Sequence, residues 1–363
     1  MIAWAEKKLA VWVLTPHGMD LANQVKQALP HADLFASQKL VPGDSYTGFS
    51  TLAKALAPVW HQYDAHYFIM ATGIVVRTIA SLIQDKTKDP AVVCGDEAGR
   101  FVISLVSGHM GGANDLAGML SDILGATPVI TTATDVNQVP AIDVIARDQD
   151  LYIENTAAVK HVSMAFIKGE PLPVHDPFHL VSPHLPSALV DEPSLFSSEK
   201  SGIWVDYTIR DLPENVLVLR PKMLVAGMGC RRGVSRQELE DHLRHVFQTH
   251  GFSVNSLSKI VSVDLKAEEP GLLELARALN VPIEFYTRDQ LAQVKTVPNP
   301  SSLVNKHIGV KSVCEAAAML ATGRTCLLVP KTANRTVTLA LSKTNEYIEG
   351  SGGYCKILKT YGG

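Results

Sequence analysis

The chain has 363 residues, a length typical of two or three domains. Hydrophobic residues make up 46% of it and charged residues 19%, a composition that supports buried cores and excludes a disordered chain. The formal net charge of -3 provides no basic surplus to neutralise a phosphate backbone, so we expect no nucleic-acid partner.

The cysteines and the apolar runs indicate the compartment. Five cysteines are scattered along the chain without a CxxC pair, which argues against a disulfide framework or a cysteine zinc site and favours reduced thiols. No apolar run reaches the length of a membrane-spanning helix, so no membrane partner is expected. These features predict a cytoplasmic globular protein that holds no metal of its own.

The first part of the chain alternates between apolar runs and helical spacing. In chain order we expect a strand at 9–15, a helix at 19–29, a strand at 33–36, a helix at 49–61, a strand at 66–70 and a helix at 74–83. Strands at 91–94 and 101–105 flank a turn-rich loop and predict a hairpin, followed by a helix at 114–124 and a strand at 128–131. This pattern predicts an N-terminal α/β domain, residues 1–138, with a doubly wound and mostly parallel sheet.

The pattern weakens over residues 139–221, where prolines and histidines cluster, and we interpret this stretch as a linker or small middle α/β domain. This stretch contains three histidines that could bind a metal or could be ordinary surface residues: His175, His179 and His184. An α/β pattern resumes and predicts a C-terminal α/β domain, residues 222–345, before a tail at 346–363. Its expected elements are a strand at 223–226, a turn at 227–233, a helix at 235–250 capped by Ser235, units at 260–264, 271–279, 282–285, 313–321 and 326–330, and a strand at 336–341.

The glycine-rich turn from Ser107 to Asp115 is the first candidate site. Its glycines, Gly108, Gly111 and Gly112, let backbone approach a ligand, and the following helix offers free N–H groups to an anion. His109 is a natural proton carrier, and Asp115 could orient it or accept a proton itself. The same spacing also fits a plain turn with a helix cap, and the residues alone leave both interpretations open.

Two further strand ends in the first domain carry polar residues. Thr72 and Gly73 could hold an anion that Arg77 clamps, although an N-capped helix with a solvent-facing arginine fits equally well. Asp96 and Glu97 could supply a general base, or they could form a charged hairpin tip.

The fourth candidate lies in the C-terminal domain. Gly227 and Gly229 precede Arg231 and Arg232, a combination that suits a polycarboxylate or a phosphate. Cys230 could be a thiolate beside the arginines or a small buried residue. A nucleotide enzyme is disfavoured because the chain has neither a P-loop nor a complete GxGxxG fingerprint.

In this order, the runs at 71–77, 106–116, 131–136, 227–233 and 309–317 resemble the CbiG family, the cobalt-precorrin-5A hydrolases of anaerobic cobalamin biosynthesis. The part from about Lys222 also resembles CobE of the aerobic route. The resemblance covers nearly the whole chain. It implies a cobalt-bearing corrinoid substrate whose ring A δ-lactone is opened by water, with loss of the C20 bridge carbon as acetaldehyde to give cobalt-precorrin-5B. It implies no cofactor, because the cobalt arrives with the substrate.

With this substrate, the candidate residues take on roles. The glycine turns, with Arg77, Arg231 and Arg232, would bind the acetate and propionate groups, the turns facing one cleft. His109 would be the general base, oriented by Asp115, with Asp96 or Glu97 in reserve. A non-catalytic corrinoid carrier is the alternative. The sequence is compatible with a homodimer or with transient contact with neighbouring pathway enzymes.

Overall fold

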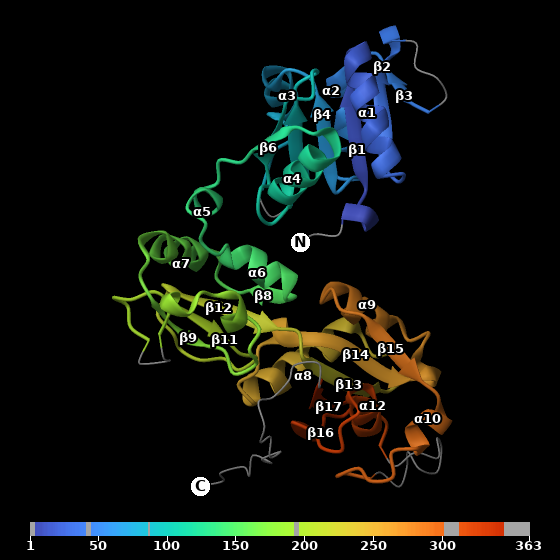
Figure 1. Cartoon of the computed structure of the whole chain (residues 1–363). Coiled ribbons are helices and arrows are strands. Elements are labelled where there is room, and N and C mark those ends of the chain that lie inside the picture. The colour runs from blue at the N-terminus through green and yellow to red at the C-terminus, as the bar shows by residue number, and fades with distance from the viewer. Residues whose placement is uncertain (1–3, 41–44, 86–87, 192–195, 301–311, 345–363) are drawn as a thin grey trace. The chain divides into compact units, whose positions relative to one another are not determined.

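A computed structural model describes residues 4–40, 45–85, 88–191, 196–300 and 312–344 (Figure 1). The chain forms two compact units, residues 1–148 and 149–363, and each is described by itself. The α/β class predicted from the sequence is confirmed in both units.

A seven-stranded sheet forms the centre of the first unit, in the order β3-β2-β1-β4-β5-β6-β7. The first five strands in this order are parallel to one another, β6 is antiparallel to β5, and β7 is parallel to β6. The strands are β1 (Leu9–Val13), β2 (Asp33–Ser37), β3 (Thr47–Phe49), β4 (Ala65–Ile69), β5 (Ala91–Gly95), β6 (Phe101–Val106) and β7 (Thr127–Val129). The helices are α1 (Pro16–Ala28), α2 (Leu52–Leu56), α3 (Thr72–Ile79), α4 (Ala113–Leu124), α5 (Ala133–Val136) and α6 (Ile142–Asp148).

Both faces of this sheet are buried, which explains the unbroken apolar run of β1. Val11 and Val13 point into the core beneath α1 and α4, whereas Ala10 and Trp12 point into the core on the other face, with α2 and α3. The predicted helix at 49–61 is wrong in extent, because β3 ends at Phe49 and α2 passes at Ala57 into a short 3-10 helix that includes Pro58.

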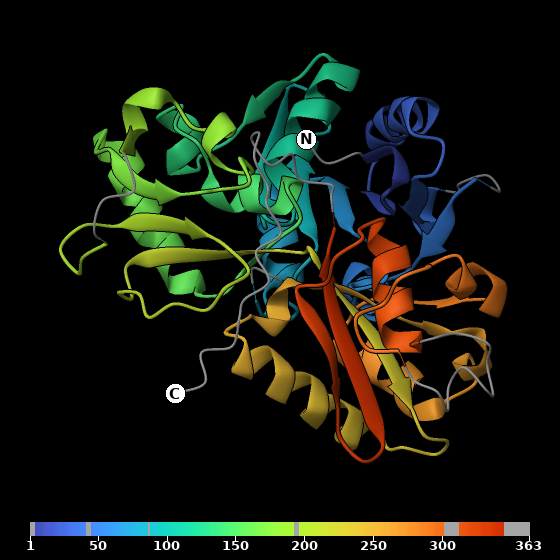
Figure 2. The same cartoon turned by 90° about the horizontal axis from the view of Figure 1, so that it is seen from below.

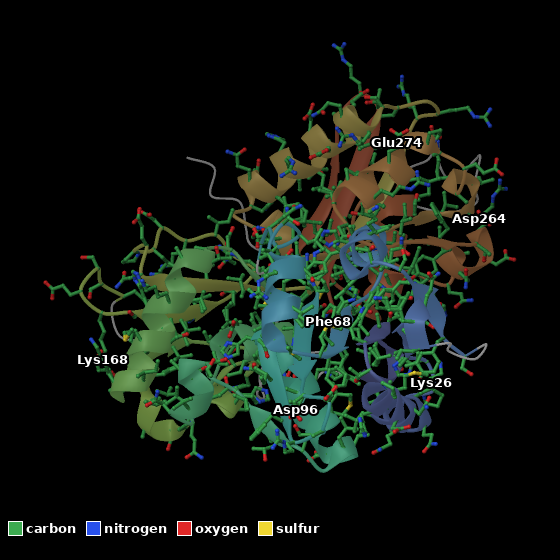
Figure 3. The ribbon with its side chains drawn as sticks, turned by 90° about the horizontal axis from the view of Figure 1, so that it is seen from above. Lys26, Phe68, Asp96, Lys168, Asp264 and Glu274 are labelled. Atoms are coloured by element: carbon green, nitrogen blue, oxygen red, sulfur yellow. The ribbon has the colours of Figure 1, made fainter. Side chains whose placement is uncertain are left out.

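The β5–β6 hairpin reverses the direction of the sheet. Val92 at the start of β5 lies opposite Val106 at the end of β6. The carboxyl ends of β6 and β7 therefore lie at the edge where β1, β4 and β5 begin. The turns that follow β4 and β6 consequently lie at opposite edges of one sheet. Figure 3 labels Asp96, in the hairpin turn itself, and Phe68, buried in β4.

The second unit begins with a five-stranded sheet in the order β10-β9-β11-β12-β8. Strand β8 is antiparallel to β12, and the other neighbours are parallel. The stretch of weak pattern is thus an ordered α/β sheet built from short strands. Its elements are β8 (Leu151–Ile153), α7 (Thr156–Lys168), β9 (Leu172–His175), β10 (Val190–Asp191), β11 (Gly202–Val205) and β12 (Val216–Pro221).

A second five-stranded sheet, in the order β15-β14-β13-β17-β16, completes this unit. Helices α8 and α12 cover its opposite faces, as Figure 2 shows. Its elements are β13 (Leu224–Cys230), α8 (Arg236–Thr249), β14 (Leu257–Val263), α9 (Pro270–Ala278), β15 (Ile283–Tyr286), α10 (Arg288–Ala292), α12 (Val313–Thr322), β16 (Val329–Ala333) and β17 (Val337–Lys343).

The predicted glycine turn at 227–233 is wrong over its first half. Gly227 and Gly229 lie inside β13, where they pair with Ala340 and Thr338 of β17. A Cβ atom at Gly227 would lie 1.9 Å from the carbonyl oxygen of Cys314, so this glycine lets α12 pack closely on the strand. The predicted N-cap is confirmed, since the Ser235 hydroxyl accepts a hydrogen bond from the amide of Glu238.

Candidate active site

His109 lies where the carboxyl ends of β6 and β7 meet. The turn after β6 carries His109, and α5 follows β7. Because β6 and β7 are parallel neighbours, side chains from these two segments come together at one edge of the sheet. Helix α6 joins them, and residues 142–148 cluster with the first unit.

The His109 imidazole is held between two carboxylates. Its Nε2 lies 2.9 Å from Oδ2 of Asp135, and its Nδ1 lies 3.3 Å from Oδ1 of Asp143. The hydrogen bond with Asp143, reinforced by Asp135, raises the pKa of His109 to about 9 against the opposing effect of burial. His109 is therefore an imidazolium at neutral pH, with both nitrogens donating, and not the free base predicted from the sequence.

Asp115 does not orient His109, contrary to the sequence prediction. Its Oδ2 lies 3.4 Å from Nη2 of Arg147, which also contacts Asp148 at 2.8 Å. The Nη1 of Arg147 donates to the carbonyl of His109 at 2.6 Å. Arg147 therefore fixes the backbone of the turn, while Asp135 and Asp143 fix the ring.

The glycine turn is closed on itself. The amides of Ala113 and Asn114 donate to the carbonyls of Ser107 and Gly108, at 3.1 and 3.0 Å. The sequence suggested that these helix N–H groups were free to bind an anion. In the structure both are already bonded within the turn. Gly111 is required by space, because a Cβ atom there would lie 2.5 Å from Cβ of Ser107. Gly112 is required by conformation, since its φ of 83° is in the left-handed region.

Asn114 connects the turn to the carboxylates. Its Oδ1 accepts from the Ser104 hydroxyl at 2.6 Å, and its Nδ2 donates to Thr132 at 3.0 Å and to Asp135 at 3.1 Å. From the sequence, no role was assigned to Asp135, Asp143 or Arg147. Asp135 could have been found, because it follows a strand whose carboxyl end is at this edge.

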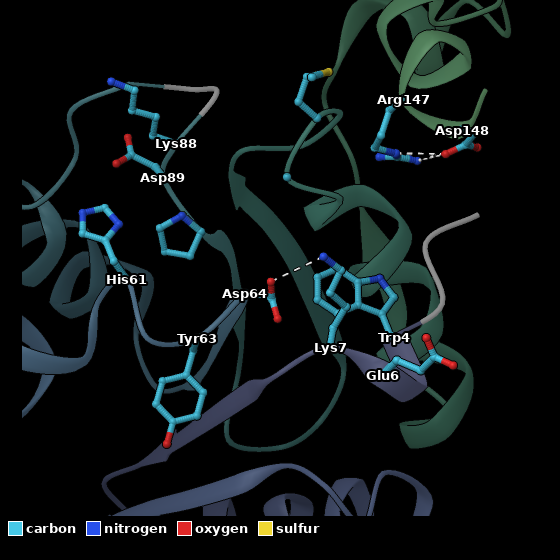
Figure 4. Close-up of a pocket in the computed structure, with 13 residues that line it drawn as sticks. Trp4, Glu6, Lys7, His61, Tyr63, Asp64, Lys88, Asp89, Arg147 and Asp148 are labelled. Atoms are coloured by element: carbon cyan, nitrogen blue, oxygen red, sulfur yellow. Dashed lines mark hydrogen bonds and ion pairs between the residues drawn. The ribbon is translucent and has the colours of Figure 1, made fainter. Parts of the chain in front are cut away.

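A pocket of about 850 Å³ opens beside this cluster (Figure 4). It lies where β1, β4 and β5 begin, and it reaches the His109 turn through Met110 and Gly111 without including the imidazole. Its charged lining is mixed, with the cations Lys7, Lys88 and Arg147 beside four carboxylates (Glu6, Asp64, Asp89 and Asp148), and Trp4 adds an aromatic wall. Lys7 pairs with Asp64 at 3.4 Å, and Arg147 pairs with Asp148 at 2.8 Å. Polar groups of both charges beside an aromatic wall suit a ligand with an apolar frame and polar substituents.

Asp89 forms part of the wall of this pocket and is 4% exposed. Its Oδ2 accepts from the amides of Gln84 and Asp85, each at 2.9 Å. Its Oδ1 is buried without a hydrogen-bond partner among the residues described. Because a buried carboxylate oxygen without a donor is costly, this atom is a candidate contact for a ligand.

The other predicted residues of the first unit lie at the opposite edge of its sheet. Thr72 contacts the Cys94 thiol at 3.5 Å, and the Arg77 guanidinium donates to the carbonyl of Gly73 at 3.0 Å. Asp96 accepts from the amides of Ala98, Arg100 and Phe101, which makes it a turn-forming residue. Arg77, Asp96 and the exposed Glu97 are therefore separated from His109 by the length of the strands.

In the C-terminal sheet, Arg231 and Arg232 are exposed after β13. Burial raises the pKa of the Cys230 thiol, which argues against the thiolate considered from the sequence. Among the three histidines of the middle region, His175 pairs with Asp206 at 3.2 Å. No group of three metal-ligating side chains occurs within the described part of the chain.

Three family models match consecutive parts of the chain. They are the N-terminal part of cobalamin synthesis G over residues 54–135, the cobalamin biosynthesis central region over 140–221, and the cobalamin synthesis G C-terminus over 224–342. With the α/β fold, these matches define an enzyme of cobalamin biosynthesis. Within the described ranges, no helix has the length and apolar character needed to cross a membrane.

The relatives are more specific. A cobalt-precorrin-5A hydrolase from Priestia megaterium is 32% identical, over 92% of this chain and 94% of its own length. A cobalt-precorrin-5A hydrolase from Salmonella typhimurium is 36% identical, over 86% and 92%. Protein CobE from a Sinorhizobium species is 33% identical, over 33% of this chain and 79% of its own length. The chain belongs to the cobalt-precorrin-5A hydrolase family.

Proposed function

We propose that the chain opens the ring A δ-lactone of cobalt-precorrin-5A and releases the C20 bridge carbon as acetaldehyde, giving cobalt-precorrin-5B. The family membership supports this substrate. The observation that carries the proposal is the His109 imidazolium held between Asp135 and Asp143, because it places a charged proton donor beside carboxylates in a turn whose Met110 and Gly111 line a pocket.

The proposed reaction balances without a redox partner. Water adds to the lactone carbonyl and the acyl–oxygen bond breaks, which leaves a carboxylate on ring A and a hydroxyl on the bridge carbon. The bond between the bridge carbon and the ring then breaks, and its electron pair stays with the macrocycle. The hydroxyl proton is lost as the bridge carbon and its methyl group leave as acetaldehyde. The cobalt stays in the substrate throughout, so the proposal includes no resident cofactor.

The geometry revises the roles proposed from the sequence. A protonated His109 cannot accept a proton, so the base is assigned to a carboxylate. Asp135 is the most exposed member of the trio, with 39% of its side chain accessible against 17% for His109 and for Asp143. In the proposed mechanism, Asp135 accepts the proton of water, and His109 stabilises or protonates the oxygen that leaves the acyl carbon. Lys88, an exposed cation of the pocket wall, attracts a carboxylate of the substrate.

Acetaldehyde release distinguishes this enzyme from a carrier. The purified chain is incubated with cobalt-precorrin-5A, and acetaldehyde is trapped and quantified. We expect catalytic turnover from the wild type and a loss of about 10²-fold or more for Asp135→Asn. Binding of the corrinoid without acetaldehyde would make the chain a carrier, and full activity of Asp135→Asn would remove the assigned base.

A further inference from the structure

A second pocket, of about 360 Å³, lies wholly within the C-terminal sheet domain. It is formed at the carboxyl end of β13, beneath the β16–β17 hairpin and beside the start of α12. Parallel strands β13 and β14 both end at this edge, which is the position where open α/β sheets bind ligands.

Four cationic side chains line this pocket, and no aspartate or glutamate is among its described lining residues. Lys266 forms an ion pair with Glu269 at 2.9 Å. Arg231, Lys331 and Arg335 have no ion-pair partner within the ranges that the structure describes. The pocket therefore has a positive charge that the described protein does not neutralise, and this favours an anionic ligand.

The walls between these cations are apolar. Val263, Val313 and Val337 line the pocket together with the thiols of Cys230 and Cys314. Burial raises the pKa of both thiols, so they add no negative charge to the pocket. An apolar interior with a cationic rim suits a ligand that carries separate acidic groups on an apolar frame.

The backbone argues against a phosphate loop. Phosphate sites of that kind present a run of free glycine amides to one compact anion. Here Gly229 lies in a strand paired with β17, so the positive charge comes from long side chains spread around the opening. Separated guanidinium and ammonium groups match separated carboxylates better than a single phosphate.

We propose that this pocket binds the peripheral carboxylates at one edge of a corrinoid, as a binding site of the C-terminal domain itself. The corrinoid class rests on the proposed function. The volume admits the acidic groups and one edge of the ring system rather than the whole macrocycle, so the rest of the ligand stays outside this pocket.

The test titrates the full chain with cobyrinic acid, a corrinoid with free carboxylates, and follows its absorbance. Lys331→Gln with Arg335→Gln is expected to weaken binding by about 10- to 100-fold, since a hydrogen bond to a charged group contributes about 1.5–3 kcal/mol. The matched control is Arg277→Gln, an exposed arginine of α9 outside the pocket, which should bind as the wild type does. Cobinamide carries amides where cobyrinic acid has carboxylates. It should bind weakly, and the double substitution should not change its affinity.

Three results would overturn this proposal: no binding of cobyrinic acid, equal weakening in the control, or displacement by inorganic phosphate at concentrations as low as those of the corrinoid. Acetaldehyde release is measured on the same proteins. If acetaldehyde is released and corrinoid binding is unaffected by the substitutions at Lys331 and Arg335, the proposed pocket is rejected and the hydrolase function stands. If corrinoid binding depends on these two residues but no acetaldehyde is released, the hydrolase function is rejected and the proposed pocket stands.

Discussion

The Nδ1 atom of His109 lies 3.3 Å from Oδ1 of Asp143, at the start of α6, while Nε2 of the same ring lies 2.9 Å from Oδ2 of Asp135 in α5. One cation thus joins two carboxylates from two short helices that follow β7. Because the imidazolium lies between two negative charges, the charge state of the ring and the placement of both helices depend on each other.

Asp143→Asn should lower the pKa of His109 from about 9 toward its ordinary value of 6.5, because the bond to Asp143 is the main cause of the rise. The titration of the ring is followed by NMR. Asp115→Asn is the matched control, since Asp115 contacts Arg147 rather than the ring, and it should leave the titration in place. Equal shifts in both variants would contradict the assignment of the orienting carboxylate.

The stabilisation from His109 should depend on pH in a defined window. A group whose pKa is raised on folding stabilises the fold fully below its unfolded value and loses that effect as the pH passes its folded value. Urea unfolding of the wild type and His109→Gln should therefore differ by roughly 1–2 kcal/mol below pH 6.5, because solvent screens the partly open cluster. The difference should shrink toward pH 9 and be absent above it. A difference that grows with pH would show that the ring is neutral in the fold.

Arg77→Ala and Glu97→Gln should leave acetaldehyde release unchanged, because both side chains lie at the edge of the sheet opposite His109. Asp96→Ala should also spare the turnover of folded protein but cost about 1–3 kcal/mol of stability, since three amides of the hairpin lose their acceptor. Steady-state kinetics and urea unfolding separate the two effects. A fall in turnover with unchanged stability would place this edge in the active site.

Gly227→Ala should destabilise the C-terminal domain by about 1–3 kcal/mol or more, because the added methyl group meets the carbonyl of Cys314 at 1.9 Å. Gly233→Ala is the comparison. No atom lies within 4 Å of a Cβ there, and the φ of 78° costs only about 1 kcal/mol for alanine. Urea unfolding monitored by circular dichroism measures both. Equal losses would argue against close packing of α12 as the reason for the glycine.

The sequence was informative where the pattern is local. The unbroken apolar run of β1 and the turn-rich loop before Phe101 predicted a buried strand and a hairpin, and both are present. The hairpin also explains why Arg77 and His109 lie apart. Because β6 runs opposite to β4 and β5, it ends at the other edge of the sheet. The hairpin predicted from the sequence already implies this reversal, so the separation of Arg77 from His109 could have been deduced by tracing strand direction through it.

Two of the residues that contact His109 could not be predicted in the same way. Asp143 and Arg147 lie in a helix whose position depends on how the chain folds back after β7, and no spacing rule connects it to a turn more than thirty residues earlier. The glycines of β13 misled for a different reason. Gly227 is needed for close helix packing, a tertiary cause that looks like a turn signal in one dimension.

Strand β13 has consequences for how the polypeptide is made. It pairs on one side with β14, which follows soon after, and on the other with β17, where Leu224 lies opposite Lys343. During synthesis, one side of β13 therefore stays without its native neighbour until nearly all of the described chain has left the ribosome. A sheet with such an unpaired strand edge folds slowly, and the edge can pair with other chains. Formation of β17 therefore determines when the newly synthesised domain is protected from aggregation.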